Sequence, residues 1–135
     1  MTYLLDTCVV SDFIKNEPNT VKKIQSVSPK DVLISSITVM EIMYGLALNP
    51  ERTKSIKDAI QNFLEVVKII NFTREDAEHT AKIRAQLKKK GTPIGDYDLL
   101  LAGTADYRKL ILVSSNMKEF NRIETLLLQN WRNPQ

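Results

Sequence analysis

The stretch YLLDTCVVSDF, residues 3–13, joins a short apolar run to a helix-like segment through a single carboxylate. The run Tyr3–Leu5 is typical of a strand buried in a parallel sheet, and Asp6 follows it directly. Further runs of this kind are Val32–Ile34, Val66–Ile70, Leu110–Val113 and, more weakly, Leu126–Leu128. We therefore expect about five strands, with Asp6 at the end of the first.

The segments between these runs carry apolar residues at helical spacing. The expected helices follow Asn19 or Thr20, cover Ser36–Leu48 and Glu51–Leu64, run from Thr73 to the lysines before Gly91, and run from Asp96 or Asp98 to Arg108. Strands that alternate with helices favour an α/β fold with a mainly parallel sheet. Ligands of such sheets bind beyond the carboxyl ends of the strands, which is where we expect Asp6.

The composition is that of an ordinary globular protein. The 135 residues are 43% hydrophobic and 26% charged, and we expect one domain over residues 1–135. The net charge of +3 permits a nucleic-acid partner but is more often that of a plain solvated surface. Cys8 is the only cysteine, and no apolar run reaches the ~20 residues of a membrane helix. With no signal-peptide pattern, we expect a cytoplasmic protein without a membrane partner.

Several acidic or amide side chains stand beside apolar segments, where an α/β fold can gather them. These residues are Asp6, Glu41, Asp96, Asp98, Asn116 and Glu119. The aspartates have a simpler interpretation as helix caps, and Asn116 and Glu119 as turn and helix-start residues. Glu41 is harder to explain in this way because both of its neighbours are apolar.

Gathered carboxylates indicate a hard metal ion. Carboxylates within ~4–6 Å raise each other's pKa, and a bound divalent cation removes that conflict. Mg²⁺ and Mn²⁺ prefer oxygen ligands. His79 is the only histidine, so zinc is not expected. We expect His79 on a helix surface, Cys8 as a small apolar residue and Asp12 as an ordinary surface carboxylate. An acidic Mg²⁺ or Mn²⁺ site in an α/β domain suits phosphodiester chemistry.

Four motifs occur in a fixed order: LLDT, SSITVMEIMYG, GTPIGDYDLLLAGTA and LVSSNMKEF, with Trp131 after them. Together they resemble the PIN-domain ribonucleases, and more closely the VapC toxins of bacterial toxin–antitoxin pairs, over nearly the whole chain. The resemblance implies a PIN-like three-layer α/β/α sandwich around a mainly parallel sheet. It also implies a metal-dependent endoribonuclease with acidic residues at the carboxyl edge of the sheet.

The resemblance also implies roles for single residues. Asp6, Glu41 and Asp98 match the acidic residues of the family, so they would hold Mg²⁺ or Mn²⁺ directly or through water. Asn116 matches a catalytic position that is Asp or Asn in the family, and an amide there gives a weaker metal site. The outer shell implied around the ion consists of Thr7, Asp96 and Glu119.

The implied partners are an RNA substrate, in particular tRNA, a VapB-type antitoxin and a second copy of the chain in a homodimer, with DNA contacted only through the antitoxin. Basic residues that could hold the RNA backbone are Arg52, Arg84, Lys88, Lys89, Lys90 and Lys118. For each of them a solvated helix face is the simpler interpretation. We expect the apolar stripe with Met40, Met43, Tyr44 and Leu48 to lie mainly in the core, because apolar stripes at helical spacing usually do. Part of it could receive an antitoxin helix.

Other α/β classes fit less well. A haloacid-dehalogenase-type phosphatase needs a second aspartate two residues after the first, where Cys8 stands. A receiver domain needs an aspartate after the third strand, where Asn71 stands, and no G-x-G-x-x-G turn is present for a dinucleotide. The remaining alternative is a non-catalytic PIN-like domain that binds RNA or a protein, which the set Asp6, Glu41 and Asp98 disfavours.

Overall fold

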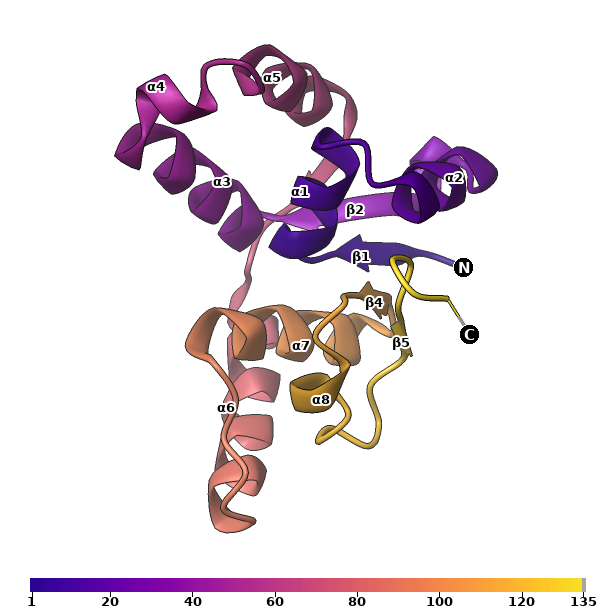
Figure 1. The fold of residues 1–135 in the computed structure, drawn as a ribbon. Helices are drawn as coiled ribbons and strands as arrows, with labels where there is room; N and C mark the ends of the chain where they lie inside the picture. The colour runs from indigo at the N-terminus through magenta and orange to yellow at the C-terminus, as the bar shows by residue number, and fades with distance from the viewer. Residues whose placement is uncertain (135) are drawn as a thin grey trace.

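The computed structural model describes residues 1–134, in which five parallel strands form one sheet in the order β3-β2-β1-β4-β5 (Figure 1). The strands are β1 (Tyr3–Leu5), β2 (Val32–Ser35), β3 (Lys68–Ile70), β4 (Ile111–Val113) and β5 (Leu128–Gln129). The predicted parallel α/β/α arrangement is confirmed. The third strand starts later than predicted because Val66 still ends the preceding helix, and the last strand is shifted towards the C-terminus.

Helices connect the strands. They are α1 (Thr7–Ile14), α2 (Pro18–Ser26), α3 (Ser36–Leu48), α4 (Pro50–Thr53), α5 (Lys57–Val66), α6 (Arg74–Lys89), α7 (Asp96–Arg108) and α8 (Met117–Phe120), with a 3₁₀ turn at Pro29–Asp31. The helix expected over residues 51–64 is divided into α4 and α5 by a turn at residues 54–56, where the Ile56 amide donates to the Thr53 carbonyl at 3.1 Å. No helix in residues 1–134 has both the length and the apolar character needed to span a bilayer.

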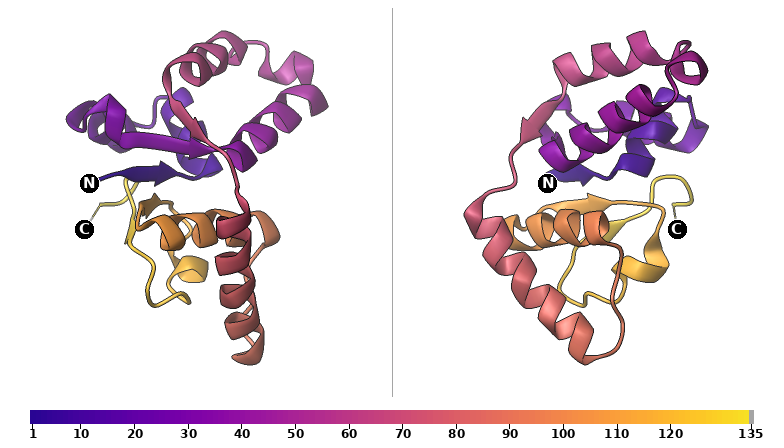
Figure 2. Two further views of the ribbon diagram at one scale, coloured as in Figure 1. Left: turned by 180° about the vertical axis from the view of Figure 1, so that it is seen from behind. Right: turned by 90° about the vertical axis from the view of Figure 1, so that its left-hand side faces the viewer.

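The sheet separates two helical layers (Figures 1 and 2). The segments α1 to α5 lie on one side, and α6 to α8 lie on the other. Alternate residues of the central strand face opposite layers: Tyr3 and Leu5 join the core on the α1 side, and Leu4 joins the core on the α7 side. Trp131 completes the first core, where its ring meets Tyr3 edge-on at 5.2 Å. Both faces of the sheet are therefore buried, and the strand ends are left to carry the functional side chains.

The pair α6 and α7 packs very closely. A Cβ atom on Gly103 of α7 would lie 1.8 Å from Thr80 Oγ1, so only glycine fits at this contact. The helix α6 begins with a capping box between Thr73 and Asp76, and Gly91 follows its end with a positive φ of 70°. This packing fixes the start of α7, which carries Asp98, against the sheet.

Candidate active site

Asp6 lies where β1 ends and α1 begins. Its backbone amide donates to the Val113 carbonyl at 3.0 Å, and its Oδ1 accepts from the Val9 amide at 2.9 Å. Only 2% of the residue is exposed. Asp6 therefore does cap α1, as its simpler interpretation predicted, but it does so from a buried position at the carboxyl end of the central strand.

Glu41 reaches the same edge of the sheet from α3. The Thr7 hydroxyl, one residue after Asp6, donates to Glu41 Oε1 at 2.7 Å across 34 residues of sequence. Glu41 is only partly exposed. This bond fixes the Glu41 carboxylate beside the first turn of α1, so Thr7 orients an acidic side chain as expected.

Asn116 joins two further carboxylates. Its Nδ2 donates to Asp98 Oδ2 at 3.2 Å and to Glu119 Oε2 at 2.6 Å. Asp98 lies in the first turn of α7, but no side chain caps the start of that helix. The interpretation of Asp98 as a helix cap is therefore wrong, and its carboxylate is oriented by an amide from the loop after β4 instead.

The charge state of Asp6 reflects its surroundings. Burial raises the pKa of Asp6 from its usual 3.8 to about 6. The Ser114 hydroxyl and the Val9 amide lower this pKa, while the negative charges of Asp98 and Glu41 raise it further. Asp6, Asp98 and Glu41 are thus close enough to interact through their charges.

Asp98 shows the same behaviour. Burial raises its pKa above the usual value, against the bond from Asn116, and the charges of Glu119 and Glu41 add to the rise. The cluster therefore holds unbalanced negative charge, which favours the binding of a proton or a cation. Within residues 1–134, no three Asp, Glu, His or Cys side chains form a group that could hold a metal ion by themselves. The carboxylates are thus coupled through space without forming a complete coordination shell.

The other predicted residues lie at varying distances from this cluster. Asp96 is exposed at the start of α7, and Lys118 is exposed on α8 beside Glu119. Arg84 and Lys88–Lys90 are exposed on α6 and the turn after it. Figures 1 and 2 show that α6 ends at a tip that points away from the sheet, so the structure does not gather these four residues with the carboxylates.

Some expectations for single residues fail because they depend on partners far away in sequence. Asp12, expected at the surface, is 7% exposed and pairs with Arg132, whose Nε lies 3.0 Å from Asp12 Oδ2. Cys8, expected to pack as an apolar residue, is exposed. His79 is only partly exposed, and its Nε2 lies 2.6 Å from Asp106 Oδ2.

Ser114 belongs to the site but was not predicted. It is fully buried, its Oγ accepts from the Asn116 amide at 2.9 Å, and its amide donates to the Gln129 carbonyl at 3.0 Å. Its hydroxyl also helps to lower the pKa of Asp6. The available signal was its position directly after β4, at the same sheet edge as Asp6.

The class of molecule is defined by a parallel sheet between two helical layers, with carboxylates at one edge that follow β1 or lie on α3 and α7. The profile of the PIN domain matches residues 3–126. The chain therefore belongs to the PIN-domain family. This agrees with the resemblance carried by the four sequence motifs.

Relatives within the family cover almost the whole chain. The tRNA(fMet)-specific endonuclease VapC of Salmonella typhimurium is 35% identical over 133 residues, which are 97% of this chain and 98% of that protein. The crystal structure of VapBC2 from Rickettsia felis bound to a promoter DNA fragment contains a chain with a TM-score of 0.86 and 32% identity, covering 97% of this chain and 99% of that one. DNA-bound VapBC from Salmonella typhimurium gives a TM-score of 0.86 at 35% identity, with 97% and 98% coverage.

Proposed function

We propose that this chain is an endoribonuclease toxin of a type II toxin–antitoxin pair. The observation that carries the proposal is the coupling of Asp6, Glu41 and Asp98, brought from three separate elements to the carboxyl edge of a PIN-domain sheet. Membership of the family and similarity to proteins named as VapC ribonucleases support the same activity. The reaction is hydrolysis of an RNA phosphodiester bond.

We propose that Asp6, Glu41 and Asp98 hold one Mg²⁺ or Mn²⁺ ion, directly or through water. The donor chemistry supports this, since all three offer oxygen and the two aspartates carry raised pKa values that a cation would lower. Such an ion, when bound, polarises the phosphate and makes water a better nucleophile. Thr7 keeps the Glu41 carboxylate oriented, and Asn116 does the same for Asp98.

The proposed substrate is a folded RNA, with tRNA as the first candidate. The support is the name of the Salmonella typhimurium relative, a tRNA(fMet)-specific endonuclease. A folded RNA is selected by its shape and by an exposed single-stranded loop, while contacts to its backbone supply affinity. We propose Lys118, exposed beside Glu119, as the basic residue of the predicted set that lies best for such a contact.

The proposed protein partner is a VapB-type antitoxin, through which a DNA contact would be made. Several solved structures similar to this chain are VapBC complexes, some of them with DNA. On α3, Met43, Tyr44 and Leu48 are 47%, 63% and 59% exposed, so the expectation that this apolar stripe lies mainly in the core is wrong. A groove of about 180 Å³ between α1, α3 and α5 is lined in part by Glu41 and Leu46. We propose that an antitoxin helix covers this surface and that the free toxin is a cytoplasmic homodimer.

Cleavage of total RNA by purified protein tests the activity. We expect the wild type to cut RNA with Mg²⁺ or Mn²⁺ and to stop cutting in EDTA. Asp6→Asn and Asp98→Asn should reduce the rate by about 10²-fold or more, while the exposed Asp58→Asn on α5 serves as the control with the same loss of charge. Cleavage by Asp6→Asn in EDTA would exclude the proposed mechanism. A wild type that binds RNA and cuts none with either metal would support the non-catalytic alternative.

A further inference from the structure

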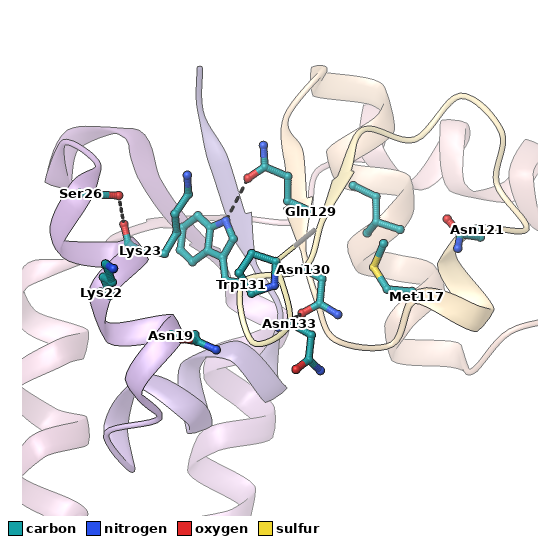
Figure 3. Close-up of a pocket in the computed structure, with 12 residues that line it drawn as sticks. Asn19, Lys22, Lys23, Ser26, Met117, Asn121, Gln129, Asn130, Trp131 and Asn133 are labelled. Atoms are coloured by element: carbon teal, nitrogen blue, oxygen red, sulfur yellow. Dashed lines mark hydrogen bonds between the residues drawn. The ribbon is translucent and has the colours of Figure 1, made fainter.

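A groove of about 1030 Å³ separates α2 from the chain that leaves β5 (Figure 3). One wall is formed by α2 with Asn19, Lys22, Lys23 and Ser26. The other wall is formed by residues 128–131 with Asn133 and Pro134, and one end is lined by Met117 of α8 and by Asn121, which follows that helix. Two lysines and no acidic residue line it, so the groove carries positive charge.

The groove borders the candidate active site. Met117 follows Asn116, the residue that bonds to Asp98, directly in sequence. The Ser114 amide donates to the carbonyl of Gln129, so the end of β4 and the end of β5 are joined at the same sheet edge. The groove therefore begins at the same end of the sheet as the carboxylates, one residue along the chain from the side chain that bonds to Asp98.

Three carboxamides in the groove are held in fixed orientations. Gln129 Oε1 accepts from the Trp131 indole at 3.0 Å, and Asn130 Oδ1 accepts from the Asn133 amide at 3.0 Å. Asn19 Nδ2 donates to the Arg132 carbonyl at 2.8 Å. These bonds leave the Gln129 and Asn130 amide groups as donors and the Asn19 oxygen as an acceptor, and no hydrogen bond within residues 1–134 uses these atoms.

Such a set matches the edges of unpaired nucleobases. Asn and Gln side chains can contact base edges through an amide donor or a carbonyl acceptor, and lysines beside them neutralise backbone phosphates. The chain that forms this wall is held rigidly: Trp131 is 2% exposed, and Arg132 pairs with the buried Asp12. Fixed donors and acceptors distinguish bases better than mobile ones, since less order is lost on binding.

We propose that this groove binds a single-stranded segment of the RNA substrate next to the bond that is cut. Lys22 and Lys23 hold its phosphates, and the carboxamides of Asn19, Gln129 and Asn130 contact its bases. The proposal rests on the proposed ribonuclease function and adds to it a surface that selects the substrate. The groove contains no row of large exposed apolar side chains, which an antitoxin helix would need.

The test measures binding of a labelled single-stranded RNA oligonucleotide by fluorescence anisotropy, with every protein carrying Asp6→Asn to prevent cleavage. We expect Lys22→Ala with Lys23→Ala to weaken binding roughly tenfold at low salt and to reduce the slope of log K against log salt by about 1.4, as for two lost phosphate contacts. The control is Lys30→Ala with Lys57→Ala, which removes the same charge from exposed positions outside the groove. Equal affinity and slope for the two double variants would overturn the proposal.

A second pair of variants tests the positive charge of the groove without removing any side-chain hydrogen bond of the fold. Asn121→Asp places a carboxylate at the exposed end of the groove, and Asn62→Asp makes the same change on α5. We expect only Asn121→Asp to weaken RNA binding, and equal binding by both would count against the groove.

The cleavage assay separates this proposal from the proposed function. If the wild type cuts RNA and the groove variant binds and cuts like its control, the groove assignment alone fails. If the wild type does not cut RNA, the proposed ribonuclease function itself is wrong. If the lysine double variant keeps its RNA affinity but no longer binds a co-expressed antitoxin, the assignment to RNA is wrong and the groove binds the protein partner.

Discussion

Thr7 and Glu41 are joined by a hydrogen bond of 2.7 Å that links the first turn of α1 to the middle of α3. Replacing Thr7 with Val keeps the shape of the side chain and removes the donor, so the Glu41 carboxylate loses its fixed orientation. We expect Thr7→Val to lower the rate of RNA cleavage about tenfold and stability by about 1 kcal/mol. Thr7→Ser keeps the hydroxyl and should retain most activity. Equal rates for the two variants in a single-turnover assay would show that the bond does not matter.

Asp6 gives the protein a distinctive dependence on pH. Burial raises the pKa of Asp6 in the folded protein to about 6 from 3.8. As pH rises between these values, Asp6 ionises more readily in the unfolded chain, so the free energy of unfolding falls, by about 3 kcal/mol once the pH is above both. Below pH 3.8 both states hold the proton and no penalty remains. Asp6→Asn removes the charge and keeps the helix cap.

In EDTA, Asp6→Asn should therefore be more stable than the wild type at pH 7.5, and the gain should shrink steadily towards pH 5. Urea denaturation at several pH values measures the difference in the free energy of unfolding. Asp58→Asn, at an exposed position, should show no such trend. A gain from Asp6→Asn that stays constant with pH would contradict this assignment.

Asn116 stabilises two carboxylates at once through its amide. Asn116→Asp replaces that donor with a third negative charge beside Asp98 and Glu119. Without divalent metal we expect a loss of about 1–3 kcal/mol. At the proposed Mg²⁺ site the new carboxylate would add an oxygen ligand, so the rise in melting temperature on adding Mg²⁺ should exceed that of the wild type. Asn62→Asp controls for the added charge. An Asn116→Asp protein that is as stable as the wild type in EDTA would contradict this prediction.

Asp12 and Arg132 form an unequal pair. The Asp12 side chain is 9% exposed, whereas that of Arg132 is 47% exposed. Removing Arg132 leaves a buried carboxylate without its partner, whereas removing Asp12 leaves a guanidinium that water can reach. We expect Arg132→Ala to cost about 2–4 kcal/mol and Asp12→Ala about 1 kcal/mol.

Trp131, the only tryptophan of the chain, reports on this pair directly. In Arg132→Ala its emission should shift to the red as the segment after β5 loosens, and Asp12→Ala should show a smaller shift. If urea denaturation shows a larger loss in the free energy of unfolding for Asp12→Ala than for Arg132→Ala, Asp12 is not effectively buried.

Much of the fold could be predicted from the sequence because local signals are strong. Ser36–Leu48 forms a helix with the predicted ends, and the Thr73–Asp76 capping box is present. The break between α4 and α5 was missed because it depends on a single turn at residues 54–56, whereas the start of α8 after Asn116 agrees with the interpretation of Asn116 and Glu119 as turn and helix-start residues. The weakest predicted strand proved to be displaced, since β5 is fixed by pairing with β4 and not by its own residues.

The site could be predicted in part for the same reason. Asp6 and Asp98 stand beside strong strand and helix signals, so their common edge follows from the topology. Ser114 and the pairing of Asp12 with Arg132 could not be foreseen, because each depends on contacts with a distant part of the chain. The groove beside α2 was missed too, since its walls come from opposite ends of the sequence.

The strand order also governs when activity can arise during synthesis. The central strand β1 leaves the ribosome first, but its neighbour β4 comes from residues 111–113, late in the chain. Asp6 donates its backbone amide to Val113, and Asp98 relies on Asn116, so neither carboxylate is held in place in an incomplete chain. A polypeptide that is still being translated therefore has no assembled site with which to attack RNA in the machinery that is producing it.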